Sequence, residues 1–369
     1  MILEVIHAMK FPRFLFAILV LTTALLLSAC SGVVGNASWP GITADSTTAY
    51  VAYSAQVHAV DLNNGLQKWV YPEKAEAGTT FYAAPVLSPD GQLIVASYSH
   101  KIYSLDPNTG AEKWRFEKAT DLYVTSPLVT SSAIYAPNTD GKLYAVDMQG
   151  LLLWEFKSAQ HLWATPLYKE SCDCLFQPSM DHYLYAINAK NGAEIWKTED
   201  LGAAMVAQPA LAADGTLYLG TFKGEMLAID SSNGKILWRF KAGGWIFSSA
   251  VLNGDNLFFG DMKGNIYMLN ASTGSKVWEK TIGDGTTPNA VVTTPLIQDE
   301  TIYISTETST IYTYSLDGVP GWTKTLTNKV YAPIIPSGSN LLVAVNDVNA
   351  PLQAISKVGA DVWTFSLKK

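Results

Sequence analysis

The chain has 369 residues, of which 48% are hydrophobic and only 15% are charged, so it is long and apolar enough to bury a large core. Its formal net charge is −7. This acidic balance argues against a protein that binds nucleic acid, and against one held on anionic lipid by a polybasic surface.

The N-terminal segment resembles a bacterial lipoprotein signal peptide. Lys10 and Arg13 precede an apolar run at residues 14–27, and the segment ends in Leu-Ser-Ala-Cys at residues 27–30. The run is short for a membrane-spanning helix and leads into small residues before a cysteine. We therefore expect a signal peptide over residues 1–29, with Met9 as an alternative start.

This resemblance implies that Cys30 becomes the lipidated first residue of the mature protein, which is then anchored to a membrane outside the cytoplasm. Cys30 and a flexible tether rich in small residues would occupy residues 30–38. Ser31 and Gly32 follow the cysteine, where an aspartate would indicate retention at the inner membrane. If the organism has two membranes, we expect the outer membrane and a periplasmic location.

Eight tryptophans divide the rest of the chain into eight units, with steps of 40 to 45 residues between them. They are Trp69, Trp114, Trp154, Trp196, Trp238, Trp278, Trp322 and Trp363. A period in the low forties, with several short alternating apolar runs in each unit, is typical of a four-stranded β-propeller blade. The sequence therefore predicts an all-β fold, an eight-bladed β-propeller with four antiparallel strands per blade, over residues 39–369.

The second unit shows the expected strands clearly, at residues 84–87, 92–98, 101–106 and 112–116. Valine, isoleucine, leucine and tyrosine alternate there with small or polar residues, and Asp-Gly and Thr-Gly pairs indicate the turns. The fifth unit repeats the pattern at residues 208–211, 216–221, 225–230 and 236–240. No stretch after the signal peptide shows helical periodicity.

A spaced motif accompanies most of the tryptophans, as in Asp106, Gly110 and Trp114. It resembles the tryptophan-docking repeat of propellers of the pyrroloquinoline-quinone type. The resemblance implies that the tryptophans pack between neighbouring blades, and that the glycines allow positive φ in the turn before each last strand. We expect these motifs to build the ring and to take no part in catalysis.

The two ends of the repeat region predict a simple closure of the ring. The first unit begins on its own strand near residues 40–44, and the last unit ends on a strand at residues 362–367. We therefore expect no long strand exchange between the first and last blades, and a monomeric propeller.

Cys172 and Cys174 are expected in the turn between the first two strands of the fourth unit. In an extended chain their Cα atoms would be about 6.6 Å apart, near the upper limit for a bridge. A disulfide and a pair of free thiols both stay open. No further ligands at zinc spacing accompany them, and we expect no metal site. The histidines are scattered and form no triad; they are His7, His58, His100, His161 and His182.

Function is expected in the loops that join the last strand of one blade to the first strand of the next, because in propellers these loops surround the entrance to the central channel. They carry an uneven set of apolar side chains, the funnel ring: Phe81, Tyr82, Tyr123, Trp163, Met205, Trp245, Phe247 and Tyr331. Exposed aromatic surface of this kind binds protein partners or extended peptides. For part of the ring, a packed top of the core is the alternative.

The combined pattern resembles the propeller lipoproteins of the outer-membrane β-barrel assembly machinery, the BamB family. This resemblance implies a non-catalytic, lipid-anchored scaffold that binds protein and needs no cofactor. A dehydrogenase that uses pyrroloquinoline quinone with Ca²⁺ is one alternative, with Asp261, Glu307 and Asp347 as candidate acidic residues.

The other alternative is an extracytoplasmic sensor or solute-binding module that uses the same face. It would need convergent polar groups at the channel entrance. Thr165, Gln208 and Thr294, near the starts of first strands, could supply them.

Overall fold

The computed structural model describes residues 39–283, 285 and 289–367. The signal peptide, Cys30 and the tether lie outside the described residues, so the predictions made for them stay predictions. Within the described part, no helix has both the length and the apolar character needed to cross a membrane.

The described chain forms eight four-stranded antiparallel sheets, each made of four consecutive strands. Blades one to four comprise β1 (Gly41–Ala44), β2 (Thr48–Tyr53), β3 (Gln56–Asp61), β4 (Gln67–Tyr71), β5 (Val86–Leu87), β6 (Leu93–Ala96), β7 (Ile102–Leu105), β8 (Glu112–Phe116), β9 (Leu128–Val129), β10 (Ile134–Pro137), β11 (Lys142–Val146), β12 (Leu152–Lys157), β13 (Leu167–Lys169), β14 (Cys174–Pro178), β15 (Leu184–Asn188) and β16 (Glu194–Lys197). Blades five to eight comprise β17 (Ala210–Leu211), β18 (Thr216–Gly220), β19 (Glu225–Asp230), β20 (Ile236–Lys241), β21 (Val251–Asn253), β22 (Asn256–Gly260), β23 (Asn265–Asn270), β24 (Lys276–Thr281), β25 (Leu296–Gln298), β26 (Thr301–Ser305), β27 (Thr310–Ser315), β28 (Pro320–Thr325), β29 (Ile335–Ser337), β30 (Asn340–Ala344), β31 (Leu352–Ser356) and β32 (Asp361–Phe365).

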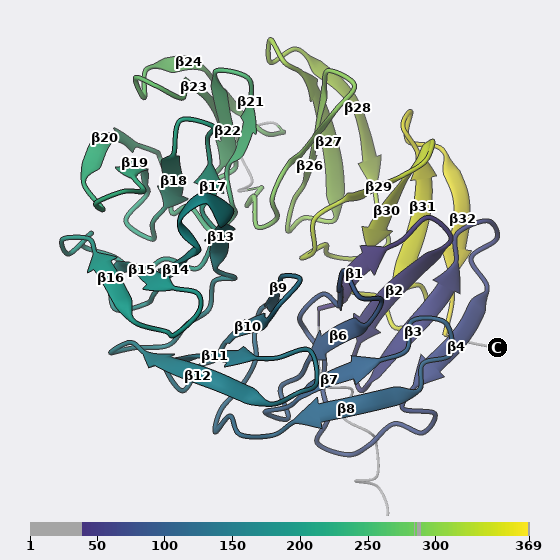
Figure 1. The fold of residues 1–369 in the computed structure, drawn as a ribbon. Helices are drawn as coiled ribbons and strands as arrows, with labels where there is room; N and C mark the ends of the chain where they lie inside the picture. Colours follow the sequence, from purple (N-terminus) through teal and green to yellow (C-terminus); the bar gives the residue numbers. More distant parts are fainter. Residues whose placement is uncertain (1–38, 284, 286–288, 368–369) are drawn as a thin grey trace, which may run out of the picture. The chain divides into compact units, whose positions relative to one another are not determined.

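Figure 1 shows the blades in chain order around a ring, so the predicted eight-bladed β-propeller is confirmed. The yellow strands β29 to β32 lie beside the purple strands β1 to β4. Each blade keeps its own four strands, and the expected absence of strand exchange at the closure is confirmed for the described chain.

Burial differs between the strands of one blade in the way that the apolar pattern predicts. In blade five, every residue of β18 is buried, whereas β20 alternates between half-buried and exposed positions. β20 is the outer edge of its sheet, and its exposed positions include Lys241. A charged edge discourages pairing with another chain.

The first strand of several blades is shorter than predicted. Residues 84–87 were expected to form the first strand of blade two, but only Val86–Leu87 does so. Pro85 precedes this strand and has no N–H for the ladder, which accounts for the late start.

Each docking tryptophan packs its indole on a glycine of the following blade. A Cβ built on Gly110 would lie 2.7 Å from the ring of Trp69, and one on Gly192 would lie 2.5 Å from the ring of Trp154. These glycines have φ values of 74°. The position therefore requires glycine for two reasons: the backbone has a positive φ, and the indole leaves no room for a Cβ atom.

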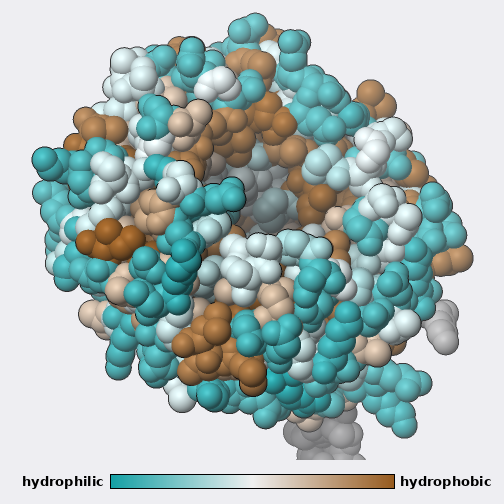
Figure 2. All heavy atoms as spheres, in the orientation of Figure 1, coloured by the Kyte–Doolittle hydropathy of each residue, from teal (hydrophilic) through white to brown (hydrophobic). Residues whose placement is uncertain are grey.

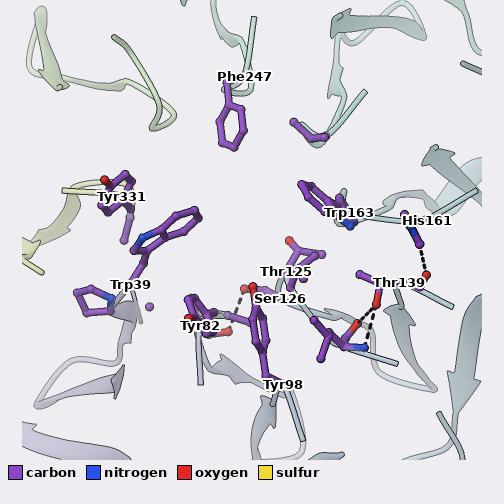
Figure 3. Close-up of a pocket in the computed structure, with 18 of the residues that line it drawn as sticks. Trp39, Tyr82, Tyr98, Thr125, Ser126, Thr139, His161, Trp163, Phe247 and Tyr331 are labelled. Carbon is purple, nitrogen blue, oxygen red and sulfur yellow. Dashed lines mark hydrogen bonds between the residues drawn. The ribbon is translucent and has the colours of Figure 1, made fainter. Parts of the chain in front are cut away.

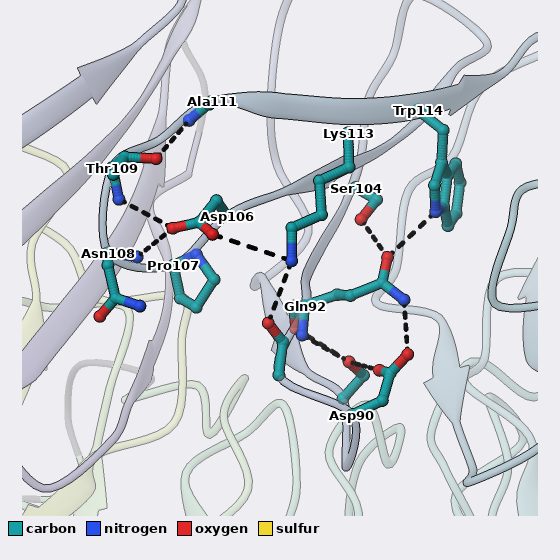
Figure 4. Close-up of polar contacts among 12 residues, drawn as sticks. Asp90, Gln92, Ser104, Asp106, Pro107, Asn108, Thr109, Ala111, Lys113 and Trp114 are labelled. Carbon is teal, nitrogen blue, oxygen red and sulfur yellow. Dashed lines mark hydrogen bonds and ion pairs between the residues drawn. The ribbon is translucent and has the colours of Figure 1, made fainter.

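The same tryptophans also donate a hydrogen bond across the junction between two neighbouring blades, which we call a seam. In the part of the chain that the structure describes, seven of the eight indole N–H groups donate to a backbone carbonyl of the following blade. Figure 4 shows the surroundings of Trp114, whose Nε1 lies 3.0 Å from Oε1 of Gln92. In the turn shown there, Asp106 accepts hydrogen bonds from the N–H groups of Asn108 and Thr109.

The seam between the last and first blades uses the same contact. The indole of Trp363 donates to the carbonyl of Leu62 at 2.8 Å, and its ring lies against Gly65. Phe365 packs in one apolar cluster with Ile42 and other residues of blades one and eight. In the described chain, side-chain contacts between the two blades, and not an exchanged strand, therefore close the ring.

Candidate binding surface at the channel mouth

A cavity of about 570 Å³ opens where the loops between blades meet the central channel. Figure 2 shows a hollow in the middle of the ring, with hydrophobic side chains along part of its wall. The cavity lining contains six large aromatic side chains, which are Trp39, Tyr82, Tyr98, Trp163, Phe247 and Tyr331 (Figure 3). Aromatic side chains offer a large apolar contact area and have few rotatable bonds, so little conformational entropy is lost when they bind a partner.

Four of these rings form a continuous aromatic wall on one side of the cavity. Trp39 stacks on Tyr331 with centroids 4.5 Å apart, and it meets the edge of Tyr82 at 6.0 Å. Tyr82 stacks on Tyr98 at 3.9 Å. Because burial raises the pKa of Tyr98 to about 12 and also raises that of Tyr82, both phenols stay protonated at neutral pH. Tyr82 and Tyr98 therefore add no charge to the wall.

Trp163, Phe247 and His161 lie across the cavity from this wall (Figure 3). Trp163 is 37% exposed, so part of its indole is free to contact a partner. His161 Nδ1 contacts the carbonyl oxygen of Thr139, which fixes the ring. Asp121 is the one acidic residue that lines the described cavity, and no lysine or arginine lines it.

The structure divides the predicted funnel ring into two classes. Phe81, Tyr123 and Met205 are fully buried between blades, and they are not available to a partner. Tyr82, Trp163, Phe247 and Tyr331 line the cavity as expected. Including Phe81, Tyr123 and Met205 in an exposed ring was therefore wrong.

The reason is an alternation within the loops themselves. In seven loops two apolar residues are adjacent, and the first of each pair is fully buried: Phe81, Tyr123, Leu162, Met205, Ile246, Val291 and Val330. The second residue of six pairs lines the cavity instead. Successive side chains of an extended segment point to opposite sides. The first residue of each pair therefore packs between two blades, and the second faces the channel.

Trp245 also lies elsewhere than predicted. It precedes the pair of Ile246 and Phe247, is 60% exposed, and does not line the channel cavity. It borders a second depression between blades five and six and stacks on Phe222 at 5.8 Å. Ile246 and Phe247 stand five and four residues before β21, as Phe81 and Tyr82 stand before β5, so Trp245 lies one position before the pair that follows the common pattern.

Trp39 and Tyr98 are cavity residues that the sequence analysis missed. Trp39 stands before the first strand of blade one, at the end of the expected tether, and it is 43% exposed. Tyr98 follows β6 in the turn that leads to β7. The signal that could have found Tyr98 is the equivalent turn position in other blades, where Phe222 and Met262 stand.

The acidic and polar groups considered for the two alternatives have structural partners. Asp261 is buried and accepts hydrogen bonds from the N–H groups of Gly244, Lys263 and Asn265, from the Asn265 amide and from the Tyr267 hydroxyl. These donors stabilise a turn and leave the carboxylate no free face.

Three further candidates behave in the same way. Glu307 pairs with Lys329 at 2.7 Å. Thr165 donates to the carbonyl of Ser126, and Gln208 donates to that of Pro166, so both connect neighbouring first strands. Among the described residues no group of three or more histidine, cysteine, aspartate or glutamate side chains could hold a metal ion.

Cys172 and Cys174 lie in the turn between β13 and β14, where a short helix, η2 (Glu170–Cys172), shortens the chain. Their Cα atoms are 5.2 Å apart, closer than in an extended strand, and the sulfur atoms are joined as a disulfide. This turn belongs to the set that faces away from the channel mouth, so the pair takes no part in the cavity.

Comparisons with known proteins agree with this geometry. A family profile described as outer membrane protein assembly factor BamB matches residues 31–165, 180–279 and 243–364. The chain belongs to the BamB family. Assembly factors of this name from Shewanella oneidensis and Bordetella pertussis are relatives: the first is 22% identical over 62% of this chain and the second 27% over 29%.

The matches cover only part of those relatives, 62% of the Shewanella protein and 28% of the Bordetella protein. Two solved structures are similar to this chain in fold. The crystal structure of BamB from Moraxella catarrhalis superposes with a TM-score of 0.72 at 16% identity, over 85% of this chain and 92% of that one. The computationally designed Ika8 protein superposes with a TM-score of 0.71 at 14% identity, over 90% and 98%. At these identities the likeness shows the fold alone.

Proposed function

We propose that this chain is a non-catalytic scaffold for outer-membrane protein assembly, which binds a protein or an extended peptide at the channel mouth. Its place in the BamB family supports the setting, because relatives in that family are named as assembly factors. Lipidation at Cys30 would hold the propeller at the outer membrane, facing the periplasm.

The aromatic cavity carries the proposal. Six aromatic rings border about 570 Å³, and Asp121 and His161 are the ionisable groups beside the tyrosines in the described lining. A surface with large apolar anchors and few charges suits the apolar side chains and backbone of a polypeptide. Thr125 and Ser126 add hydroxyl groups to the cavity lining, and both hydroxyls are hydrogen-bonded to a neighbouring blade.

The quinone alternative fits this cavity poorly. Pyrroloquinoline quinone carries carboxylates and would need cationic partners, but the described lining contains no lysine or arginine. The acidic residues that a Ca²⁺ ion would require are also used elsewhere, since Asp261 holds a turn and Glu307 pairs with Lys329. No observation favours the solute-binding alternative, because Thr165 and Gln208 are committed to contacts between blades.

Site-specific photo-crosslinking in cells that express the full chain tests the proposal. A photoreactive residue would replace Trp163 or Tyr331 at the cavity, and Lys235 would serve as the control. Lys235 precedes β20 at the end of blade five that faces away from the mouth. We expect discrete adducts from the two cavity positions, which mass spectrometry identifies as assembly components or outer-membrane protein precursors.

Adducts of equal yield from Lys235, or no protein adduct from either cavity position, would contradict the proposal. The second result would redirect the search to small solutes. The redox state of Cys172 and Cys174 does not enter the test, because that turn lies at the other end of blade four.

A further inference from the structure

A second depression, of about 320 Å³, lies at the junction of blades five and six, and we call it the lysine pocket. Three lysines border it: Lys223, Lys241 and Lys263. The rest of its lining is Ala242, Gly243, Gly244, Trp245 and Met262. The lysine pocket shares no lining residue with the channel cavity.

The three lysines have no acidic partner in the described chain. None of them takes part in an ion pair there, whereas other lysines such as Lys142 and Lys329 do. All three side chains are exposed. The Lys241 ammonium group donates a hydrogen bond to the carbonyl of Lys223, which leaves its charge without a counterion. On a chain of net charge −7, three ammonium groups without an acidic partner around one depression are a local reversal of the overall charge.

The nearby carboxylate of Asp261 does not neutralise these lysines. It is buried and accepts five hydrogen bonds, from Gly244, Lys263 and Asn265 backbone groups, the Asn265 amide and the Tyr267 hydroxyl. The bond with Lys263 uses its backbone N–H, so the ammonium group remains available.

A comparison of equivalent turns shows that the lysines are particular to these two blades. The turn between the second and third strands has aspartate at its third position in blades three and four, Asp140 and Asp181. Each accepts a hydrogen bond from the loop that precedes its blade, at Thr120 and Ala159 respectively. In blades five and six that position holds Lys223 and Lys263, so a structural carboxylate is replaced by a free cation.

Trp245 gives the lysine pocket an apolar wall. It is 60% exposed and stacks on Phe222, and Phe222 stacks in turn on Phe247 at 6.0 Å. Phe247 lines the channel cavity. A line of aromatic rings thus runs from the lysine pocket to the channel mouth.

We infer that the lysine pocket binds an acidic, extended segment of a protein partner, whose carboxylates pair with the lysines while an apolar neighbour packs on Trp245. Charge complementarity selects the class of ligand. The recessed shape favours a peptide over a flat anionic bilayer, and the acidic remainder of the chain is repelled by such a surface. The inference rests on the proposed function for the kind of partner and adds a second contact point.

Fluorescence anisotropy with the full-length protein in detergent tests it. The probe is a fluorescein-labelled peptide of alternating glutamate and leucine, and its matched control has glutamine in place of glutamate. We expect the glutamate peptide to bind more tightly than the glutamine peptide, and more weakly as salt is added. The double variant Lys223→Gln/Lys263→Gln should weaken binding roughly fivefold to tenfold.

Lys235→Gln is the matched protein control, because it removes the same kind of charge from the opposite end of blade five. It should leave the affinity unchanged, and Trp245→Ala should lower the affinity while keeping the salt dependence. Equal binding of both peptides, or an equal loss with Lys235→Gln, would overturn the inference.

A membrane ligand is tested in parallel with vesicles of phosphatidylglycerol and of phosphatidylcholine. Capture by phosphatidylglycerol alone that is lost in Lys223→Gln/Lys263→Gln, without peptide binding, would overturn the inference in favour of a lipid surface. Crosslinking from Trp163 and Tyr331 reports the channel cavity separately. It can persist when the lysine pocket fails, so the two failures are distinguishable.

Discussion

The two ends of each blade are built in opposite ways. At the end that carries the turn before the last strand, all eight blades repeat one contact, an indole that packs on a glycine of the next blade. At the channel end, the turns between the second and third strands differ from blade to blade. They contain Tyr98 in blade two, Asp140 in blade three and Lys223 in blade five. The repeated end therefore determines the fold, and the variable end is where recognition can be specified.

The largest expected effect tests the repeated end. Trp238→Ala should lower the free energy of unfolding by about 3–5 kcal/mol, because it empties a junction packed with Tyr218 and Phe240. It also removes one of the two hydrogen bonds to the carbonyl of Ala271, whose other donor is the Tyr218 hydroxyl. Denaturant titration followed by circular dichroism measures the change. A loss below about 1 kcal/mol would show that the indole seams do not hold the ring.

A glycine change separates crowding from backbone strain. Gly192→Ala should cost roughly 2–3 kcal/mol, since a Cβ there has φ at 74° and lies 2.5 Å from the ring of Trp154. Gly254→Ala is the control, because its φ is 58° but nothing lies within 4 Å of the added Cβ. It should cost about 1 kcal/mol. Equal losses in the same titration would mean that contact with the indole adds nothing.

His58 tests the seam between blades one and eight through pH. Burial lowers the pKa of His58, and the hydrogen bond with Gln67 offsets this only in part. The unfolded chain therefore takes up a proton near pH 6.5, whereas the folded chain takes it up only at lower pH. Stability is complete above that pH and falls as the pH drops, by no more than about 1.4 kcal/mol per unit for one group.

His58→Gln keeps a polar side chain at this position but cannot titrate, so it should flatten the slope between pH 7 and 5. Thermal unfolding at several pH values compares it with the unchanged chain. An identical slope in both proteins would show that His58, although it packs beside Phe365, does not control the seam.

The smallest expected effect belongs to the variable end. Trp163→Ala should change the free energy of unfolding by less than about 1 kcal/mol, because the side chain is 37% exposed and lines an open cavity. Its effect should appear in partner crosslinking from Tyr331 instead. A stability loss as large as that of Trp238→Ala would remove the distinction between the two ends.

The fold could be predicted from the sequence because the residues that form the repeated contact occur in each of the eight units. A tryptophan and a glycine such as Trp69 and Gly110 recur in every unit, and eight tryptophans 40 to 45 residues apart indicate eight blades. The channel mouth was recovered only in part. Phe81 and Tyr82 are adjacent aromatic residues, and only their backbone direction decides that the first is buried and the second lines the cavity.

The remaining differences have the same physical origin. Trp39 precedes the first strand of blade one, and Tyr98 occupies a turn position where Phe222 of blade five is also aromatic. Neither lies in the loops between blades, where function was expected, so the analysis of those loops did not indicate them. The lysine pocket joins residues of two blades, from Lys223 to Lys263. In the sequence each of these lysines is typical of an exposed surface position. Only the arrangement of the blades in the propeller brings them together around Trp245.

Closure by side chains has a consequence for the order of assembly. Gly65 belongs to the first blade and meets Trp363 of the last, so this contact forms only after almost the whole repeat region is present. Until then, the apolar faces of Ile42 and Val51 have no partner in blade eight. When the chain emerges with its N-terminus first, this surface of blade one stays exposed longest. A chaperone, or another unfolded chain that aggregates with it, would bind there before the ring closes.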